Sequence, residues 1–188
     1  MLIMKIGISI NDIVRDLWSK IKVVHEKYYN SKIEGNLTET NALKKLNFTE
    51  DEFLNFLFEE APMEIFGHSK EVGNNFIRAL NEFIVNNPNF KISLISDEVG
   101  RGISSTYWFL AKYGSQIKDV KFIKQKEKSD IWNDFDVIVT NDKKIVKNKP
   151  NNKILISSRK FKGVDLKFKK PGDILNLEIF RKNEEVTT

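Results

Sequence analysis

The stretch KIGISINDIVRD, from Lys5 to Asp16, changes from one structural pattern to another within twelve residues. Isoleucines alternate with smaller residues at its start, which predicts a β-strand. Polar residues follow, and apolar side chains then recur at helical spacing, at Ile13, Leu17, Ile21 and Val24. We expect Asn11 or Asp12 to cap that helix. The stretch therefore predicts a strand, a polar loop and a helix in succession.

Length and composition favour one globular domain. The chain has 188 residues, 40% of them hydrophobic and 14 of them Phe, which is enough to bury a core. It has no uninterrupted apolar span of membrane length, and its first residues lack the pattern of a secretory signal. There is no Cys, so disulfides and thiolate chemistry are excluded. We expect no membrane association and a cytoplasmic location.

The region between the first and second strands is predicted to be helical. A short helix is expected to open at Thr38, and Thr49 with Glu52 forms a capping box for an aromatic helix that ends near Ala61-Pro62. A third helical pattern is expected from Ser69 to Pro88. About 75 residues of mostly helical sequence thus separate the two strands.

The second half alternates short strands with helices. Strands are expected at 91–96, 120–124, 136–141 and 153–158. Residues 97–105 read as a loop, 106–113 and 129–135 as helices, and 174–180 as a closing helix or strand. Such alternation favours an α/β fold, specifically a Rossmann-like three-layer parallel sheet.

Polar residues follow each predicted strand, and in an open parallel sheet these strand ends converge on the ligand site. The candidates are Ser9, Asn11 and Asp12 after the first strand, Ser96 and Asp97 after the second, Lys124, Lys126 and Lys128 after the third, and Asn141 and Asp142 after the fourth.

The set resembles the haloacid dehalogenase-like (HAD) superfamily, most closely a deoxyribonucleotidase-like branch that is common in bacteriophages. That family begins with a hydrophobic strand and Asp-x-Asp, commonly followed by an apolar pair and Arg-Asp. SINDIVRD fits this frame with Ser9 and Asn11 at the two Asp positions. The resemblance implies one HAD-like domain over 1–188, with residues 17–75 as a small helical cap-type insertion.

The resemblance also implies roles for four later residues. Ser96 stands where the family holds a phosphate oxygen, and Lys128 where it has its conserved cation. Asn141 and Asp142 stand at the acids that help to bind magnesium. The helical segment before the second strand matches the position of the family's cap.

The departures from the family pattern bear on function. In the family, the first Asp attacks phosphorus and the second transfers protons. Ser9 and Asn11 supply neither a carboxylate nucleophile nor a titratable acid. With Asn141 also replacing an acid, magnesium should bind poorly, since it prefers several charged oxygen ligands. We therefore expect no catalytic residues, no cofactor and no metal, and interpret Ser9, Asn11, Ser96, Lys128, Asn141 and Asp142 as vestigial motif positions.

Two alternatives remain open at this point. A shift by one residue would make Asp12 and Asp16 the carboxylates, although we expect them on one helical face with Asp12 as the cap. The second alternative is a magnesium-dependent phosphohydrolase of deoxynucleotides that acts through an unrecognised carboxylate arrangement, with magnesium as its cofactor.

The predicted function is that of an inactive HAD-like fold, a pseudoenzyme that contacts other protein chains in an oligomeric or virion assembly. The phage resemblance and a composition rich in Lys, Asn and Ile suggest a bacteriophage virion component, such as a connector or ring subunit, or an assembly protein, located in the host cytoplasm or the virion. Residues 143–188 hold thirteen Lys or Arg against five Asp or Glu, a net charge of +8. This basic part could also contact nucleic acid.

Overall fold

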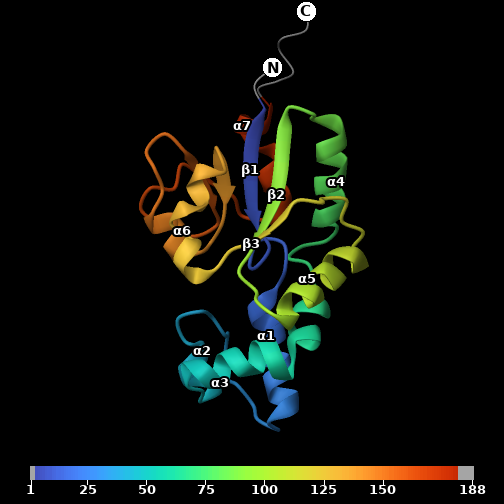
Figure 1. Cartoon of the computed structure of the whole chain (residues 1–188), viewed down its shortest axis with the longest axis vertical. Helices are drawn as coiled ribbons and strands as arrows, with labels where there is room; N and C mark the ends of the chain where they lie inside the picture. The colour runs from blue at the N-terminus through green and yellow to red at the C-terminus, as the bar shows by residue number, and fades with distance from the viewer. Residues whose placement is uncertain (1–2, 182–188) are drawn as a thin grey trace, which may run out of the picture.

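The protein is described by a computed structural model that covers residues 3–181. Six parallel strands form one sheet in the order β3-β2-β1-β4-β5-β6 (Figure 1). Their bounds are β1 Met4–Ser9, β2 Phe90–Ser96, β3 Val120–Phe122, β4 Val137–Val139, β5 Ile154–Ser157 and β6 Leu166–Lys167. The α/β, Rossmann-like architecture expected from the sequence is confirmed.

The α-helices are α1 Leu17–Tyr28, α2 Ala42–Leu46, α3 Glu50–Asn55, α4 Phe76–Asn86, α5 Arg101–Lys112, α6 Lys143–Lys147 and α7 Glu178–Arg181. Short π-helical turns, η1 Phe56–Glu60 and η2 Met63–Gly67, follow α3. Three 3₁₀ turns, η3 Gln125–Glu127, η4 Asp130–Asn133 and η5 Pro171–Asn176, complete the set in the described part of the chain.

The sheet is buried on both faces, as parallel sheets generally are. One face, including Ile6, Ile8 and Leu94, packs against α4, α5 and the C-terminal turns. The opposite face, including Ile95 and Ile138, packs against residues of η4 and α6. Strand side chains alternate between the two clusters because successive residues point to opposite faces. Helices therefore flank the sheet on both sides.

Residues between β1 and α4 form a separate hydrophobic cluster that includes Leu17, Ile21, Phe56 and Phe66. In Figure 1 the helices α1, α2 and α3 lie together at one end of the molecule, beyond the carboxyl end of β1. This arrangement places a helical unit over the strand ends. The sequence-based boundaries of a cap-type insertion, 17–75, stay a prediction.

The prediction of a helix directly after Asn11 was wrong. Residues 10–16 form a compact turn in which the Ile10 carbonyl accepts from both Val14 N and Arg15 N, at 2.9 and 2.8 Å. Asp12 has a left-handed φ of 66°. The helix α1 begins at Leu17, and its cap is Asp16, whose carboxylate accepts from Ser19 N. The apolar spacing was misleading because Ile13 and Val14 belong to the turn and not to a helix, yet their side chains are buried in the core.

Three other helix boundaries differ from the prediction. The helix expected at Thr38 begins at Ala42, because Thr38 N bonds the Asn41 side chain in a turn. The Thr49–Glu52 capping box is confirmed, but helical structure resumes at Met63 instead of ending at Pro62. The third helix begins at Phe76 and not at Ser69, whose hydroxyl donates to the Ile65 carbonyl.

In the second half, the four predicted strands are confirmed with small shifts, but the predicted loop 97–105 is largely helical. Helix α5 begins at Arg101. Its buried Gly102 packs closely against Glu98 and Phe58, so a larger side chain at this position would contact both. The helix α6 and the two-residue strand β6 were missed, since both are too short to show a periodic pattern. No helix among residues 3–181 is long and apolar enough to cross a membrane.

Candidate functional site

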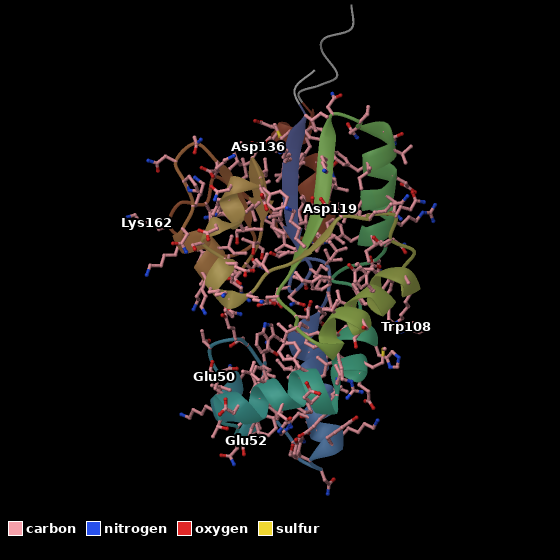
Figure 2. The ribbon with its side chains drawn as sticks, in the orientation of Figure 1. Glu50, Glu52, Trp108, Asp119, Asp136 and Lys162 are labelled. Carbon is pink, nitrogen blue, oxygen red and sulfur yellow. The ribbon has the colours of Figure 1, made fainter. Side chains whose placement is uncertain are left out.

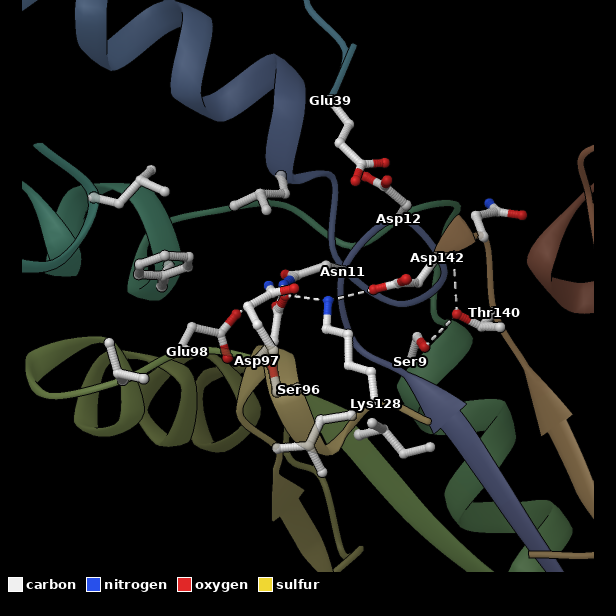
Figure 3. Close-up of a pocket in the computed structure, with 18 of the residues that line it drawn as sticks. Ser9, Asn11, Asp12, Glu39, Ser96, Asp97, Glu98, Lys128, Thr140 and Asp142 are labelled. Carbon is white, nitrogen blue, oxygen red and sulfur yellow. Dashed lines mark hydrogen bonds and ion pairs between the residues drawn. The ribbon is translucent and has the colours of Figure 1, made fainter. Parts of the chain in front are cut away.

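A cavity of about 430 Å³ lies at the carboxyl ends of the central strands. Its floor holds all six residues identified at motif positions, which lie at or after the ends of β1, β2, β3 and β4. Figure 3 labels five of them, all except Asn141. Its opposite wall is apolar and comes from α1, α3 and the π turns. The sequence-based expectation that these strand ends converge is thus confirmed for Ser9, Asn11, Ser96, Lys128, Asn141 and Asp142.

Ser9 and Asn11 are held by neighbouring side chains. The buried Ser9 hydroxyl donates to Thr140 Oγ1 at 2.7 Å, which joins the ends of β1 and β4. The Asn11 amide donates to Glu98 Oε1 at 2.8 Å and to Asp97 Oδ1 at 3.2 Å. Its oxygen accepts two hydrogen bonds from Arg15. The acceptor of the Ser9 hydroxyl is thus another hydroxyl, which is not a general base.

Arg15 and Glu98 form the most deeply buried ion pair at the site, and sequence analysis assigned a role to neither. The guanidinium also donates to Thr106 Oγ1 at 2.8 Å and to the Phe66 carbonyl at 3.2 Å. Burial lowers the pKa of Arg15, and the charge of Glu98 opposes that effect. The sequence signals for this pair were the Arg-Asp match of SINDIVRD, which includes Arg15, and the position of Glu98 two residues after β2.

Ser96 belongs to the same network. Its hydroxyl donates to the second carboxylate oxygen of Glu98, two residues further along the chain. The side chain of Ser96 is buried at the end of β2. The hydroxyl that the family resemblance assigned to a phosphate oxygen is therefore bound to an anion of the protein itself.

Lys128 lies between two carboxylates, as Figure 3 shows. Its ammonium donates to Asp97 Oδ2 at 2.8 Å and also to Asp142 Oδ2. Burial alone would lower the pKa of Lys128, but the charges of Asp97 and Asp142 more than offset it and raise that pKa. The ammonium is thus charged at neutral pH and neutralises part of the floor. Of the three lysines considered after β3, Lys128 is the one with this buried pairing.

Asp142, which stands at one of the magnesium-binding acid positions implied by the resemblance, caps a helix. It is the N-cap of α6, and its Oδ1 accepts from Lys144 N at 2.7 Å and Ile145 N at 3.2 Å. With Oδ2 bound to Lys128, both carboxylate oxygens are engaged. This capping role was not anticipated, because a five-residue helix leaves little trace in the sequence.

Asn141 turns toward β5. Its amide oxygen accepts from the Ser157 hydroxyl at 2.8 Å and the Ser158 hydroxyl at 3.1 Å, and its nitrogen donates back to Ser158. These bonds join the ends of β4 and β5. The side chain therefore has a structural partner for each of its polar atoms.

Asp12 and Asp16 have different surroundings in the structure. Asp16 caps α1, whereas Asp12 lines the cavity and accepts from the Trp18 indole at 3.1 Å and from Arg159 at 3.4 Å. The expectation that Asp12 caps the helix was wrong because the turn at residues 10–16 displaces the helix start. Burial raises the pKa of Asp12, although Arg159 and Trp18 act in the opposite direction.

The residues present do not fit a magnesium ion. Asp97 and Asp142 share the Lys128 ammonium, which stands where a dication would have to approach both carboxylates. Among residues 3–181, no group of three or more His, Cys, Asp or Glu side chains is placed to hold a metal. Magnesium would therefore have to displace the Lys128 ammonium, because the other oxygen of Asp142 is occupied in capping α6.

The architecture and the converging strand ends define the class as an α/β fold with a Rossmann-like parallel sheet and a site at its carboxyl edge. Comparison with solved structures identifies the particular fold. The HAD hydrolase YfnB of Bacillus subtilis, solved with bound magnesium, matches with a TM-score of 0.58 and 10% sequence identity, over 96% of this chain and 100% of that chain.

Two further structures agree. A HAD-superfamily hydrolase of subfamily IA from Geobacter sulfurreducens matches with a TM-score of 0.55 and 9% identity, over 93% of this chain and 95% of that one. A haloacid dehalogenase-like hydrolase from Burkholderia xenovorans matches at 0.51 and 9%, over 95% and 98%. No protein-family profile and no curated protein sequence matches the chain. The chain has a HAD-like fold, as the sequence resemblance implied.

Proposed function

We propose that this chain is a HAD-like protein that has lost phosphoryl-transfer chemistry and acts through contacts with other protein chains. One observation carries the first half of the proposal, namely that the polar groups on the cavity floor bind one another. Asp97 and Asp142 neutralise Lys128, and Glu98 neutralises Arg15. Catalysis by oriented charge needs groups that can act on the substrate, and these groups are already engaged.

The chemistry at β1 supports the same conclusion. Aspartyl-phosphate formation requires a carboxylate at the first position and a proton-transferring acid at the second. Ser9 is bound to Thr140 and Asn11 to Glu98, so neither side chain replaces those functions.

The experiment is phosphate release from an aryl phosphate and a panel of deoxynucleotides, with magnesium, by the natural chain, by Asp142→Ala and by the double variant Ser9→Asp/Asn11→Asp. We expect the natural chain to release no more phosphate than Asp142→Ala. Activity gained in the double variant would support the loss of chemistry at these two positions. Magnesium-dependent turnover by the natural chain that disappears in Asp142→Ala would refute the proposal and favour the phosphohydrolase alternative.

An exposed apolar patch supports the protein-contact half of the proposal. Met63, Tyr107 and Trp108 are 40%, 49% and 51% exposed, and Met63 and Trp108 both lie against Gly67. Figure 2 shows Trp108 at the periphery of the molecule, on α5. Aromatic residues and Met are enriched at protein interfaces, so this is the surface where we place a partner chain.

A paired substitution tests that surface. Trp108→Ser should abolish cross-linking of the chain to its partner in cells of the source, whereas Val85→Ser, at a 70% exposed site on α4, should leave it unchanged. Equal cross-linking by both variants would remove the patch as the contact surface. The virion form of the proposal, which rests on composition and resemblance, predicts the chain in purified particles; particles that lack it would contradict that form.

A second partner class, nucleic acid, is favoured by one observation. Eight exposed lysines lie from α6 to the residue before η5: Lys143, Lys144, Lys147, Lys160, Lys162, Lys167, Lys169 and Lys170. Binding through such a surface should weaken steeply as salt rises, because it releases counterions. Absent or salt-insensitive binding to single-stranded and duplex DNA would remove this candidate.

A further inference from the structure

The cavity has a wall that the motif comparison does not explain. Trp18 and Phe53 stack at a centroid distance of 6.4 Å on one part of it, and Phe58 and Phe66 stack at 5.5 Å on another. At about 430 Å³ the cavity is within the range of small-molecule sites. Flat aromatic walls of this kind suit a planar apolar body.

The charge of the lining differs from that of a phosphate site. Five acidic residues line the cavity, Asp12, Glu39, Asp97, Glu98 and Asp142, against two basic ones, Lys124 and Lys128. Lys128 is already held by two carboxylates, and the fully buried Arg15 is held by Glu98. A phosphate dianion that entered the cavity would meet an excess of acidic side chains. The most deeply buried cation near the cavity, Arg15, is already paired with Glu98.

Among the described residues, Glu39 is the least engaged of these acids, whereas Asp12 forms a long ion pair with Arg159. In Figure 3 the carboxylates of Glu39 and Asp12 face each other at one side of the cavity. Among the described residues, the Glu39 carboxylate has no hydrogen-bond or ion-pair partner in the protein. Asp12 accepts only from Trp18 and, at 3.4 Å, from Arg159. A cation between these two carboxylates would face two negative groups, with the N–H edge of the Trp18 indole bound to one of them.

We propose that this cavity binds an organic amine with a planar aromatic body, and that it discriminates against the phosphate ester of the same body. The aromatic wall holds the ring, and Asp12 and Glu39 hold the ammonium. The charged side chains on the polar floor neutralise one another, so no charged group of the ligand is required to balance them. This inference rests on the proposed loss of phosphoryl transfer.

The test compares three probes that share an indole ring and differ in the end group: tryptamine, tryptophol and tryptophol phosphate. Dissociation constants are measured by isothermal titration with the natural chain. We expect tryptamine to bind most tightly and tryptophol phosphate most weakly. No measurable binding of tryptamine, or phosphate-ester binding as tight as that of the amine, would overturn the inference.

Two variants locate the binding. Glu39→Gln should weaken tryptamine about fivefold, as expected for one carboxylate near a cation in water, and leave tryptophol unchanged. Leu54→Arg, at a 45% exposed position on the cavity wall, should weaken tryptamine and strengthen the phosphate ester. Glu34→Gln, an exposed acid of the same loop outside the cavity, is the matched control and should change nothing.

The failures of the two proposals are distinguishable. Release of phosphate from tryptophol phosphate by the natural chain would refute the proposed loss of chemistry. Unchanged tryptamine binding in both Glu39→Gln and Leu54→Arg would refute the cavity assignment alone, whatever the hydrolysis assay shows.

Discussion

The buried pair of Arg15 and Glu98 allows the sharpest prediction of stability. Both side chains are at most 1% exposed, and the guanidinium joins the β1 turn to the Phe66 carbonyl and to Thr106 on α5. Glu98→Gln keeps the shape and an accepting oxygen but leaves the Arg15 charge without its counterion. Removing one partner of a buried pair typically costs 3–5 kcal/mol, so we expect about 3 kcal/mol, the lower end, because the amide oxygen still accepts.

The assay is urea unfolding followed by circular dichroism. The matched control is Glu82→Gln, which breaks an exposed pair with Arg78 one helical turn away and should cost no more than about 0.5 kcal/mol. Arg15→Met combined with Glu98→Gln should cost less than the two single changes added together, because no unpaired charge remains. A Glu98→Gln variant as stable as the Glu82→Gln control would refute the reasoning.

Two further predictions concern stability. Gly7→Ala should cost about 1–3 kcal/mol, since its Cβ would lie 2.5 Å from Ile95 Cδ1 and 3.0 Å from the Phe135 ring, whereas Gly172→Ala, with open space around it, should be nearly neutral; equal urea midpoints would contradict this. Asp12→Asn should stabilise the chain by an amount that grows as pH rises from the ordinary Asp pKa of 3.8 to the raised folded-state pKa of Asp12 and then stays constant, because burial disfavours the ionised carboxylate in the folded state. A stability difference that stays flat with pH, measured by urea unfolding, would contradict that prediction.

The strands and their convergence could be predicted because buried parallel strands leave apolar runs bounded by polar residues. Ser9, Asn11, Ser96 and Asn141 were located correctly for this reason, and the sheet then brought them to one cavity. The start of α1 could not be predicted, because Ile13 and Val14 have helical spacing but lie in a turn that buries their side chains. The left-handed backbone of Asp12, which marks that turn, has no clear sequence signal.

The ion-pair and hydrogen-bond partners of the site residues could not be predicted from the sequence for a different reason. The Arg15–Glu98 pair joins residues 83 positions apart, and Lys128 meets Asp97 over 31 positions. Such pairings depend on strand order and on short turns, which single-sequence periodicity does not encode. Glu39 was missed likewise, because it comes from an irregular loop that reaches the cavity only in the folded chain.

The most direct test of the central claim is a magnesium titration of the natural chain by calorimetry, beside Lys128→Met and Asp142→Ala. We claim that Lys128 already neutralises the carboxylates on which a metal would depend. We therefore expect no saturable magnesium binding to the natural chain, and a gain of binding in Lys128→Met, where Asp97 and Asp142 are released. Saturable binding to the natural chain that is lost in Asp142→Ala would contradict the claim and restore a metal-dependent phosphohydrolase as the better account.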